Sequence, residues 1–342
     1  MKHTITAIYL ILCTTLLYAQ NGFNIISKPG DKRVDIIYNS QLITSYCYYD
    51  SIAKPFLYPV NTIDGITVTR GYPIAPRLGE RTDHPHHVGI WLNYESVNGI
   101  DFWNNSTAIA PDKKNLYGTI RHEKVEKTSK SSNKAQLIAT ASWFNNQGAH
   151  FLKERTIYDF KVESGVVIID RTTTLTALNE PVVFKDVKDG FIAIRVAREL
   201  EMPSKEPGVF VDAHGNKTKV DPSAGGNISG MYYNSYGVKG DSVWSSKAPW
   251  AMLKGIKDNK DITIAIFDHP GNTGYPTYWH ARGYGLFAAN PLGRKVFSNG
   301  KETLNYSLKP GGSVTFKYRI SVASKSMKPS EMEALSKDFQ KR

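Results

Sequence analysis

The feature that most constrains the fold is a succession of short extended segments separated by turns. From Phe23 onward, β-branched and aromatic residues gather in short runs, and glycine, proline and asparagine divide them. In the run Val166–Leu178, β-branched residues fill most positions, which suits a pleated surface with one face buried. Strands at this spacing, with hardly any helical periodicity, predict an all-β sandwich or barrel. The clearest predicted strands are Val34–Tyr38, Leu42–Tyr49, Gln136–Trp143, Gly165–Leu175, Ile262–Phe267 and Ser313–Val322.

One short helix is predicted at the C-terminal end. Ser330 follows Pro329 and lies three positions before Glu333, which is the spacing of a capping box. No internal repeat and no linker rich in proline, glycine and serine divides the chain, so residues 20–342 are predicted to form a single large antiparallel β-sandwich domain. The glycine-rich stretch Met202–Ser235 is predicted to run as a long loop over its surface.

Residues 1–19 are predicted to be a signal peptide. A basic start at Lys2 precedes a mostly apolar run over 5–17, and the small residue Ala19 suits cleavage before the mature chain. Cys13 lacks a small residue just before it, so a lipoprotein is not expected. No later segment has the uninterrupted apolar length of a membrane span. The mature protein is therefore expected to be periplasmic or secreted, and not membrane-embedded.

The charge and cysteine content narrow the partners and the compartment. The formal net charge is +12, but the basic residues are dispersed singly or in pairs, which disfavours nucleic acid and is typical of a basic solvated surface. Such a surface could still favour acidic sugars. After removal of the signal peptide only Cys47 remains, so no intramolecular disulfide can form.

The stretch Arg81–Trp103 is the first candidate site, because it places three histidines within four positions. Imidazole titrates near neutral pH and is the commonest metal ligand in proteins. Pro85 disfavours a helix and biases His84 toward an extended conformation. In an extended segment His84 and His86 would point to one side and His87 to the other, so two functional imidazoles and one structural imidazole are expected.

A second cluster runs from Asp268-His269 through Trp279-His280-Ala-Arg282 to Asn290. An indole face, an imidazole and a guanidinium are useful together against a polyol or a carboxylate. For any one of these histidines a hydrogen-bonded structural role is at least as common, so the prediction depends on their number. His122 is isolated in sequence, and Arg195 follows a turn that carries two acids.

Several standard signatures are missing from the sequence. It has no Gly-x-Ser-x-Gly elbow, Walker A loop, paired Cys-x-x-Cys or His-Glu-x-x-His motif. Serine esterase chemistry, nucleotide hydrolysis and structural zinc are therefore disfavoured. No cofactor is predicted, but a transition metal held by His84, His86, His122 or His280 stays open.

Four motifs together resemble a bacterial family often labelled "methane oxygenase PmoA". They are Lys-Pro-Phe-Leu-Tyr-Pro (54–59), Asp-His-Pro-His-His-x-Gly-Ile-Trp (83–91), Asn-Gly-Ile-Asp-Phe-Trp (98–103) and Tyr-Trp-His-x-Arg-x-Tyr continuing to Asn-Pro-Leu-Gly (278–293). The label itself does not imply methane oxidation, since membrane methane monooxygenase subunits carry several transmembrane helices. The resemblance implies an uncharacterised β-sandwich similar to the galactose-mutarotase supersandwich, and hence carbohydrate as the ligand.

The sequence therefore predicts an exported carbohydrate-active enzyme, a hydrolase, lyase or epimerase, with histidine acid–base chemistry in an aromatic-lined cleft. The partner would be a glycan or a small sugar. The predicted catalytic residues are His86, His87 and His280, with Asp101 or Asp268 orienting an imidazole. The predicted substrate-binding residues are Lys54, Trp91, Trp103, His122, Arg195, Trp279, Arg282 and Asn290. The alternatives are a histidine-ligated metal oxidoreductase and a non-catalytic glycan-binding protein.

Overall fold

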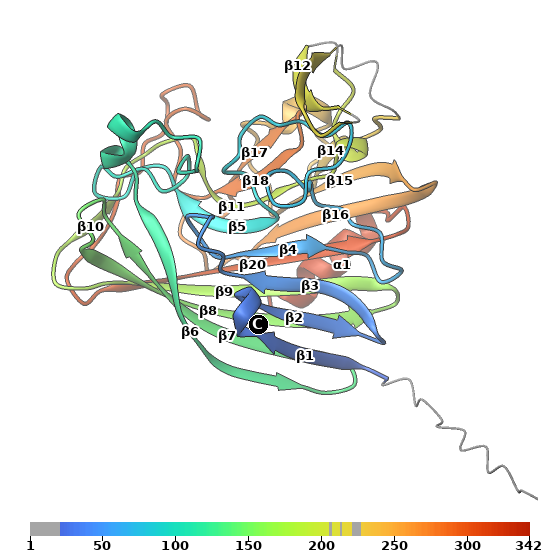
Figure 1. Ribbon diagram of the computed structural model, residues 1–342, viewed down its shortest axis with the longest axis horizontal. Helices are drawn as coiled ribbons and strands as arrows, with labels where there is room; N and C mark the ends of the chain where they lie inside the picture. The colour runs from blue at the N-terminus through green and yellow to red at the C-terminus, as the bar shows by residue number, and fades with distance from the viewer. Residues whose placement is uncertain (1–20, 205–206, 213, 221–226) are drawn as a thin grey trace, which may run out of the picture.

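The computed structural model describes residues 21–204, 207–212, 214–220 and 227–342. The signal peptide predicted over residues 1–19 lies outside them. Two eight-stranded antiparallel sheets pack face to face, as Figure 1 shows. Sheet A has the order β1 (Phe23–Lys28), β2 (Arg33–Tyr38), β3 (Gln41–Cys47), β4 (Phe56–Val60), β5 (Ile90–Tyr94), β11 (Gly190–Arg195), β18 (Leu286–Asn290) and β17 (Tyr278–Arg282).

Sheet B forms the other layer of the sandwich. Its order is β14 (Met231–Asn234), β15 (Trp250–Lys257), β16 (Lys260–Asp268), β20 (Ser313–Ala323), β9 (Val166–Ala177), β8 (His150–Glu163), β7 (Lys134–Phe144) and β6 (Thr119–Lys130). Two antiparallel pairs of short strands lie outside the sheets: β10 (Val182–Phe184) with β19 (Tyr306–Leu308), which are distant in sequence, and the hairpin of β12 (Gly208–Val211) and β13 (Lys217–Val220). Short 3-10 helices are η1 (Pro29–Asp31), η2 (Pro111–Leu116), η3 (Arg198–Leu200) and η5 (Gly240–Val243).

The main core lies between the two sheets, because each strand alternates its side chains between two faces. In β11, Ile192 and Ile194 belong to this core, whereas Ala193 belongs to a separate cluster on the outer face of sheet A. From sheet B, Trp143 and Phe316 are fully buried in the same core. The alternation thus leaves sheet A with an outer face that other parts of the chain must cover.

The C-terminal helix α1 (Pro329–Phe339) covers the outer face of sheet B. Met332 and Phe339 pack there with Ile168 and Phe267. The predicted cap is wrong by two residues: the backbone N–H of Lys328 donates to the Glu331 carboxylate at 2.8 Å, whereas Glu333 accepts from the indole N–H of Trp250 at 3.2 Å. Proline at the first helical position removes an N–H that would have had no partner, which favours the earlier start.

The predicted fold class is confirmed: the protein is an all-β chain of large antiparallel sheets with one short C-terminal helix. Each of the six predicted strands overlaps an observed strand, namely β2, β3, β7, β9, β16 and β20. The stretch Met202–Ser235 is less irregular than predicted, since β12, β13 and β14 lie within its described part. In the described residues, no helix is long and apolar enough to cross a membrane.

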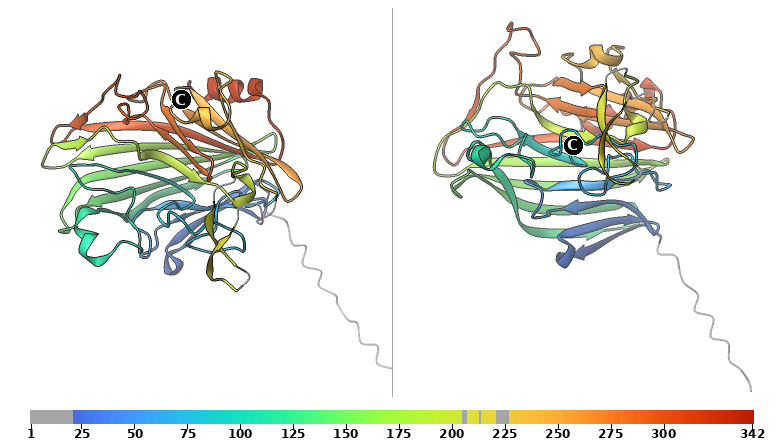
Figure 2. Two further views of the ribbon diagram at one scale, coloured as in Figure 1. Left: turned by 90° about the horizontal axis from the view of Figure 1, so that it is seen from above. Right: turned by 45° about the horizontal axis from the view of Figure 1, so that its top comes forward.

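Connecting segments, rather than a helix, cover the outer face of sheet A. Phe56, Trp91, Ala193 and Ala288 of four adjacent strands form an apolar cluster there with Trp103 from the connection after β5. The hairpin of β12 and β13 projects from this side, and α1 lies on the opposite side of the sandwich (Figure 2, left). Polar and titratable side chains from the connections collect above the apolar cluster.

Candidate functional site

The histidine segment lies in the connection between β4 and β5, and its three rings meet. The ring centroids are 4.8 Å apart for His84 and His87, 4.4 Å for His86 and His87, and 5.6 Å for His84 and His86. The prediction that His87 would point away from the other two is wrong. His84 has φ +44°, in the left-handed region rather than extended, so the segment turns and brings all three imidazoles to one side.

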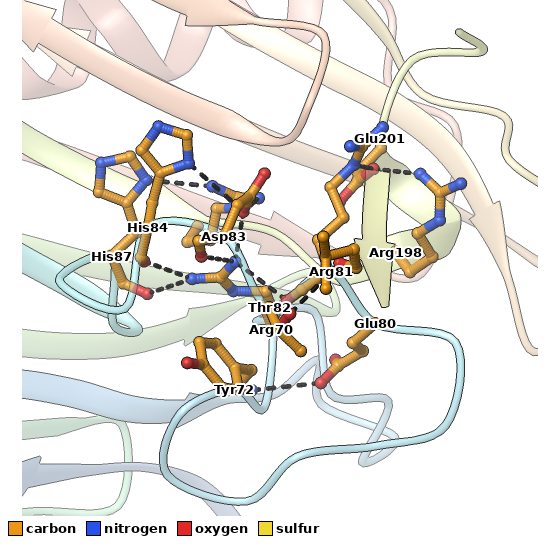
Figure 3. A network of polar contacts seen from close by, with 12 residues as sticks. Arg70, Tyr72, Glu80, Arg81, Thr82, Asp83, His84, His87, Arg198 and Glu201 are labelled. Carbon is orange, nitrogen blue, oxygen red and sulfur yellow. Dashed lines mark hydrogen bonds and ion pairs between the residues drawn. The ribbon is translucent and has the colours of Figure 1, made fainter. Parts of the chain in front are cut away.

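A buried arginine holds this turn in place. Arg70, with 1% of its surface exposed, donates through Nη1 to the carbonyl oxygens of Arg81 and Asp83 at 3.2 and 2.8 Å. Through Nη2 it donates to the carbonyl oxygens of His84 and His87 at 2.8 and 3.1 Å, as Figure 3 shows. A planar guanidinium has enough donors in a fixed arrangement to bind several carbonyls at once. Arg70 therefore sets the backbone path of the histidine segment.

Asp83 joins two guanidinium groups beneath the imidazoles. Its Oδ1 accepts from Arg70 Nη1 at 2.9 Å and from Arg195 Nη2 at 2.7 Å, and it lies 3.4 Å from His84 Nδ1. Burial alone would raise the pKa of Asp83, but the contact with His84 and the charges of Arg195 and Arg70 lower it below its usual value. Asp83 is thus held ionised next to His84.

The contact between Arg195 and His87 fixes the tautomer of the imidazole. Arg195 Nη1 lies 3.1 Å from His87 Nδ1, and arginine can only donate. His87 must therefore be neutral, with Nδ1 unprotonated and the proton on Nε2. Burial, with the neighbouring His86 and Arg195, also holds the pKa of His87 well below its usual value. Nε2 is buried and has no hydrogen-bond partner among the described residues.

His86 is anchored through its backbone and keeps its ring free. Its carbonyl oxygen accepts from Lys54 Nζ at 2.7 Å, whereas its buried Nε2 has no hydrogen-bond partner in the described part of the chain. Burial and the charge of Lys54 hold the pKa of His86 well below its usual value, so the ring is neutral at pH 7. A neutral imidazole can accept a proton from a ligand, which fits the predicted acid–base role.

The two tryptophans of this region form a floor rather than exposed walls. Trp91 and Trp103 have at most 1% of their surface exposed, and their rings are 5.2 Å apart. The His87 ring stacks on Trp91 at 5.2 Å, and Lys54 Nζ lies 5.5 Å from the centre of the Trp91 ring. Because protein groups already cover both faces of this floor, the predicted stacking of Trp91 and Trp103 on a sugar does not fit the geometry.

His280 reaches the same outer face of sheet A from β17. It pairs in register with Ala288, which pairs with Ala193, which in turn pairs with Trp91. The row spans three strand spacings, so the Cα atoms of His280 and Trp91 are about 14 Å apart. The carboxylate nearest to His280 is Asp189, with 3.6 Å between Oδ1 and Nδ1. The structure thus brings the two histidine clusters to one face, although no direct contact joins His280 to His86.

An open cleft lies beside the histidine cluster. It has a volume of about 500 Å³, and its lining includes Arg81, Asp241, Trp244, Arg282 and Tyr284. The Tyr284 ring stacks on His84 at 4.9 Å with a 7° angle between the planes, so the cleft and the imidazoles share a wall. The guanidinium of Arg282 lies 5.7 Å from the Trp244 ring and 6.0 Å from the Tyr284 ring. Arg282, a predicted substrate-binding residue, therefore lines the cleft.

A second ionic cluster supports the wall of the cleft. Arg81 Nε donates to Glu201 Oε2 at 2.8 Å, and Arg198 pairs with the same oxygen, as Figure 3 shows. Both guanidinium groups also lie against the Phe210 ring of β12, at 5.0 and 4.6 Å. The hairpin that borders the cleft is thereby tied to the segment that precedes the histidines.

Three predicted site residues have structural roles instead. Trp279 is fully buried in the main core, where its indole N–H donates to the carbonyl of Ala248 at 3.1 Å. Asn290 uses its amide nitrogen on two carbonyls and its oxygen on two backbone N–H groups, which secures a turn. Asp268 is buried in sheet B and accepts from the Asn272 amide at 2.7 Å and the Thr277 N–H at 2.8 Å. None of the three can contact a ligand in the cleft.

Asp101 and His122 do not join the imidazole cluster directly. The Asp101 carboxylate accepts from both the backbone and the side chain of Asn104, at 2.9 and 2.8 Å, and burial raises its pKa. His122 lies in a separate pocket, which Lys54 also lines. Among the described residues, no three His, Cys, Asp or Glu side chains form a set that could hold a metal ion. The proposed ligand set of His84, His86, His122 and His280 is thus not assembled.

Sequence reasoning missed several residues of this site. Arg70 and Trp244 carry no motif, so only the folded chain reveals them. Asp189 is one of the two acids in the turn before Arg195, and the sequence indicated no role for it. Tyr284 lies within the Tyr-Trp-His-x-Arg-x-Tyr motif, and that position was the available signal for it.

The comparisons with known proteins give a family and a set of distant structures. Residues 33–337 match a family of unknown function, DUF6807, and no curated protein matches the sequence. The galactosidase domain of an α-galactosidase–sucrose kinase, AgaSK, is 11% identical with a TM-score of 0.41 over 88% of this chain and 42% of that one. The α-galactosidase AgaB from Geobacillus stearothermophilus is 9% identical with a TM-score of 0.41 over 89% and 41%.

A galactose mutarotase related enzyme from Lactobacillus acidophilus is 10% identical, with a TM-score of 0.30 over 89% of this chain and 98% of that one. The chain therefore spans about two fifths of the length of the two galactosidases and nearly the whole length of the mutarotase-related protein.

Proposed function

We propose that this chain, which belongs to the DUF6807 family, is a carbohydrate-active enzyme that uses imidazole acid–base chemistry beside the cleft on the outer face of sheet A. The observation that carries the proposal is the position of two imidazole–carboxylate pairs on one face. Asp83 lies 3.4 Å from His84, and Asp189 lies 3.6 Å from His280. Neither Nδ1 ring nitrogen has a hydrogen-bond partner among the described residues, so each carboxylate acts on the neighbouring imidazole through its charge, which would stabilise the positive charge that forms during proton transfer.

The acid–base roles fall to His86 and His280. Burial lowers the pKa of His280 to about 4, with the charge of Asp189 opposing part of the shift. His86 is neutral for the same reason. Both rings are therefore unprotonated at pH 7, and each has a nitrogen lone pair for a proton from a ligand.

The cleft supports a sugar rather than an apolar ligand. Trp244 is half-buried and offers an indole face, Arg282 offers hydrogen-bond donors, and Asp241 offers acceptors. Sugar rings present apolar C–H faces and polar edges, which match aromatic and charged side chains respectively. Arg195, a predicted ligand-binding residue, is fully buried and cannot reach a ligand in the cleft. It instead donates hydrogen bonds to His87 and Asp83 and holds them in place.

The test is product formation on a panel of glycosides, oligosaccharides and oxidised sugars, followed by mass spectrometry. General acid–base groups contribute about 100-fold or more to a rate, so His280→Gln is expected to lose at least that much activity on the responsive substrate. His150→Gln alters an exposed histidine at the start of β8 and is the matched control, with activity retained. Turnover unaffected by both His280→Gln and His86→Gln would contradict the proposed roles.

A non-catalytic sugar-binding protein is the second candidate, because burial leaves His86 and His280 weakly basic. It predicts that sugars bind the cleft but that no panel member is converted. In that case Trp244→Ala would weaken binding, whereas His280→Gln would change neither affinity nor product.

We also propose that the protein is exported, on the basis of the N-terminal sequence alone. Expression of the full chain in a Gram-negative host is expected to yield a periplasmic protein whose first residue is Gln20. A mass spectrum of the purified protein that retains Met1 would contradict this.

A further inference from the structure

A second pocket lies apart from the cleft, where the connection between β3 and β4 meets the start of β6. Its volume is about 510 Å³. The lining residues are Lys32, Tyr48, Tyr49, Asp50, Ile52, Lys54, Pro55, Thr119, Ile120, Arg121 and His122. We refer to it as the Lys54 pocket. It joins Lys54 and His122, two residues that the sequence singled out for ligand binding and that lie outside the cleft.

The charges of the Lys54 pocket are unbalanced. Asp50 is the one acidic residue among those lining it, and it pairs with Lys32. This leaves Lys54 and Arg121 as cations without a carboxylate within ion-pair distance among the described residues. Arg121 is exposed and rests against the Phe144 ring at 4.8 Å. The lining therefore contains one exposed guanidinium, Arg121, and one buried amine, Lys54, and neither is paired with a carboxylate in this described part of the chain.

Lys54 is the unusual member of this pair, because it is buried with few partners. It has 1% of its surface exposed, and its described contacts are a 2.7 Å hydrogen bond to the His86 carbonyl and the face of Trp91. An ammonium has three N–H donors, and a buried charge is costly unless an opposite charge compensates it. Burial accordingly lowers the pKa of Lys54 to about 7, with Asp101 opposing part of the shift.

Other residues that line the pocket suit a sugar ring. Tyr48 stacks on His122 with 4.1 Å between ring centroids, which gives a rigid aromatic surface. The Tyr46 hydroxyl lies 3.1 Å from His122 Nδ1, so Nε2 is the ring nitrogen left for a ligand. Thr119 adds a hydroxyl group to the lining. Aromatic faces, a hydroxyl and an imidazole edge are the groups that bind a polyol.

We propose that the Lys54 pocket binds the carboxylate of an acidic monosaccharide, with Lys54 and Arg121 facing the carboxylate and Tyr48 and His122 facing the ring. The volume is sufficient for one hexuronate. The inference rests on the proposed function in taking the ligand to be a sugar, and it adds a distinct site that selects sugars carrying a negative charge.

The test is isothermal titration calorimetry with galacturonate, galactose and inorganic phosphate as probes. Galacturonate is expected to bind the wild-type protein at least 10-fold more tightly than galactose, and phosphate is expected to bind weakly. Lys54→Met keeps the length of the side chain and removes the charge, so it should weaken galacturonate binding at least 10-fold. Lys153→Met changes an exposed lysine on β8 and should leave binding unchanged.

Arg121→Met provides a variant that does not disturb the interior, because Arg121 is exposed. It is expected to weaken galacturonate binding and leave the melting temperature unchanged. Three results would overturn the inference. The protein could bind galactose as tightly as galacturonate, or phosphate as tightly as galacturonate. Alternatively, both Lys54→Met and Arg121→Met could leave galacturonate affinity unchanged. Turnover of neutral glycosides that requires His280, without galacturonate binding, would overturn this inference alone and leave the proposed function standing.

Discussion

Single residues decide the geometry of the imidazole cluster, and Arg70 has the largest share. Its guanidinium binds four backbone carbonyls and the Asp83 carboxylate of one short segment. Burial and the charge of Arg195 lower the pKa of Arg70 to about 9, which still leaves it charged at pH 7. The left-handed backbone of His84 depends on these bonds, since a residue before proline otherwise avoids a helical backbone.

Replacing Arg70 with methionine is expected to destabilise the protein by about 3–5 kcal/mol, because buried carbonyls and a carboxylate lose their partner. Arg70→Lys should also be destabilising, since an ammonium cannot reproduce the planar set of donors. Chemical denaturation followed by tryptophan fluorescence measures the effect. Arg155→Met, at an exposed ion pair with Glu126, should cost less than about 1 kcal/mol, and an equal loss in both variants would contradict the role of Arg70.

The low pKa of His280 predicts a pH dependence of stability. In the folded chain this pKa is about 4, against an ordinary value of 6.5, so between these limits the unfolded chain binds more protons. The contribution of the neutral His280 ring to the free energy of unfolding is therefore fully present above pH 6.5 and is lost as the pH falls toward 4. His280→Gln is expected to reduce the loss between pH 7 and pH 4.5 by about 2 kcal/mol. Denaturation curves at both pH values test this, and identical losses in variant and wild type would contradict it.

The sequence predicted which imidazoles gather, but not how they are arranged. The sequence shows three histidines within four positions, 84–87, and a second cluster around His280. The turn at His84 was not visible, because a distant arginine with no motif imposes it. Asp83 and Asp189, rather than the predicted Asp101 and Asp268, accompany the imidazoles, since pairing depends on which connections cross above the sheet.

At the scale of elements, the strands were predictable and their boundaries were nearly so. Alternation of apolar and polar residues follows from a sheet with two different faces, which explains why β9 and β20 were recognised. Cap positions depend on single hydrogen bonds, so the start of α1 was wrong by two residues. The strands within 202–235 were missed because they are short and separated by glycine.

Helix α1 covers the side of the sandwich opposite the site, and this separation can be tested. Phe339 is buried against the outer face of sheet B, where Arg319 lies 5.0 Å from its ring and His269 contacts its face edge-on. Phe339→Ala is expected to lower the free energy of unfolding by about 3 kcal/mol. Ligand affinity, measured by calorimetry below the melting transition, should stay within a factor of two of wild type. A large change in affinity would contradict the independence of the two faces.

At the scale of the whole molecule, the cleft is assembled from four segments that are distant in sequence. Arg81 precedes the histidines, Met202 and Pro203 follow η3, Trp244 follows η5, and Arg282 ends β17. The β-strand pattern could not predict this convergence, because it depends on the order of strands in sheet A and on the paths of the connections. The fold class was thus predictable, whereas the walls of the site were not.

Trp244 is expected to supply the main surface for a sugar in this cleft. Trp244→Ala should weaken binding of the responsive sugar about 5-fold or more, because an aromatic face contributes about 1 kcal/mol or more to such contacts. The variant should keep the wild-type melting temperature within a few degrees, since the side chain is only half-buried. Trp244→Phe, which retains a ring, should recover part of the affinity. Unchanged affinity in Trp244→Ala would place the sugar elsewhere.

Lys54 contacts both the histidine segment beside the cleft and the Lys54 pocket, so it can couple ligand binding at these two proposed sites. The Lys54 ammonium binds the backbone oxygen of His86, and the same residue is part of the lining of the second pocket. A carboxylate bound in that pocket would change the charge balance around Lys54, and with it the strength of the hydrogen bond that anchors His86. Because such coupling is reciprocal, a ligand that changes the hold of the histidine segment on Lys54 must change the affinity of the second pocket for its anion by the same factor.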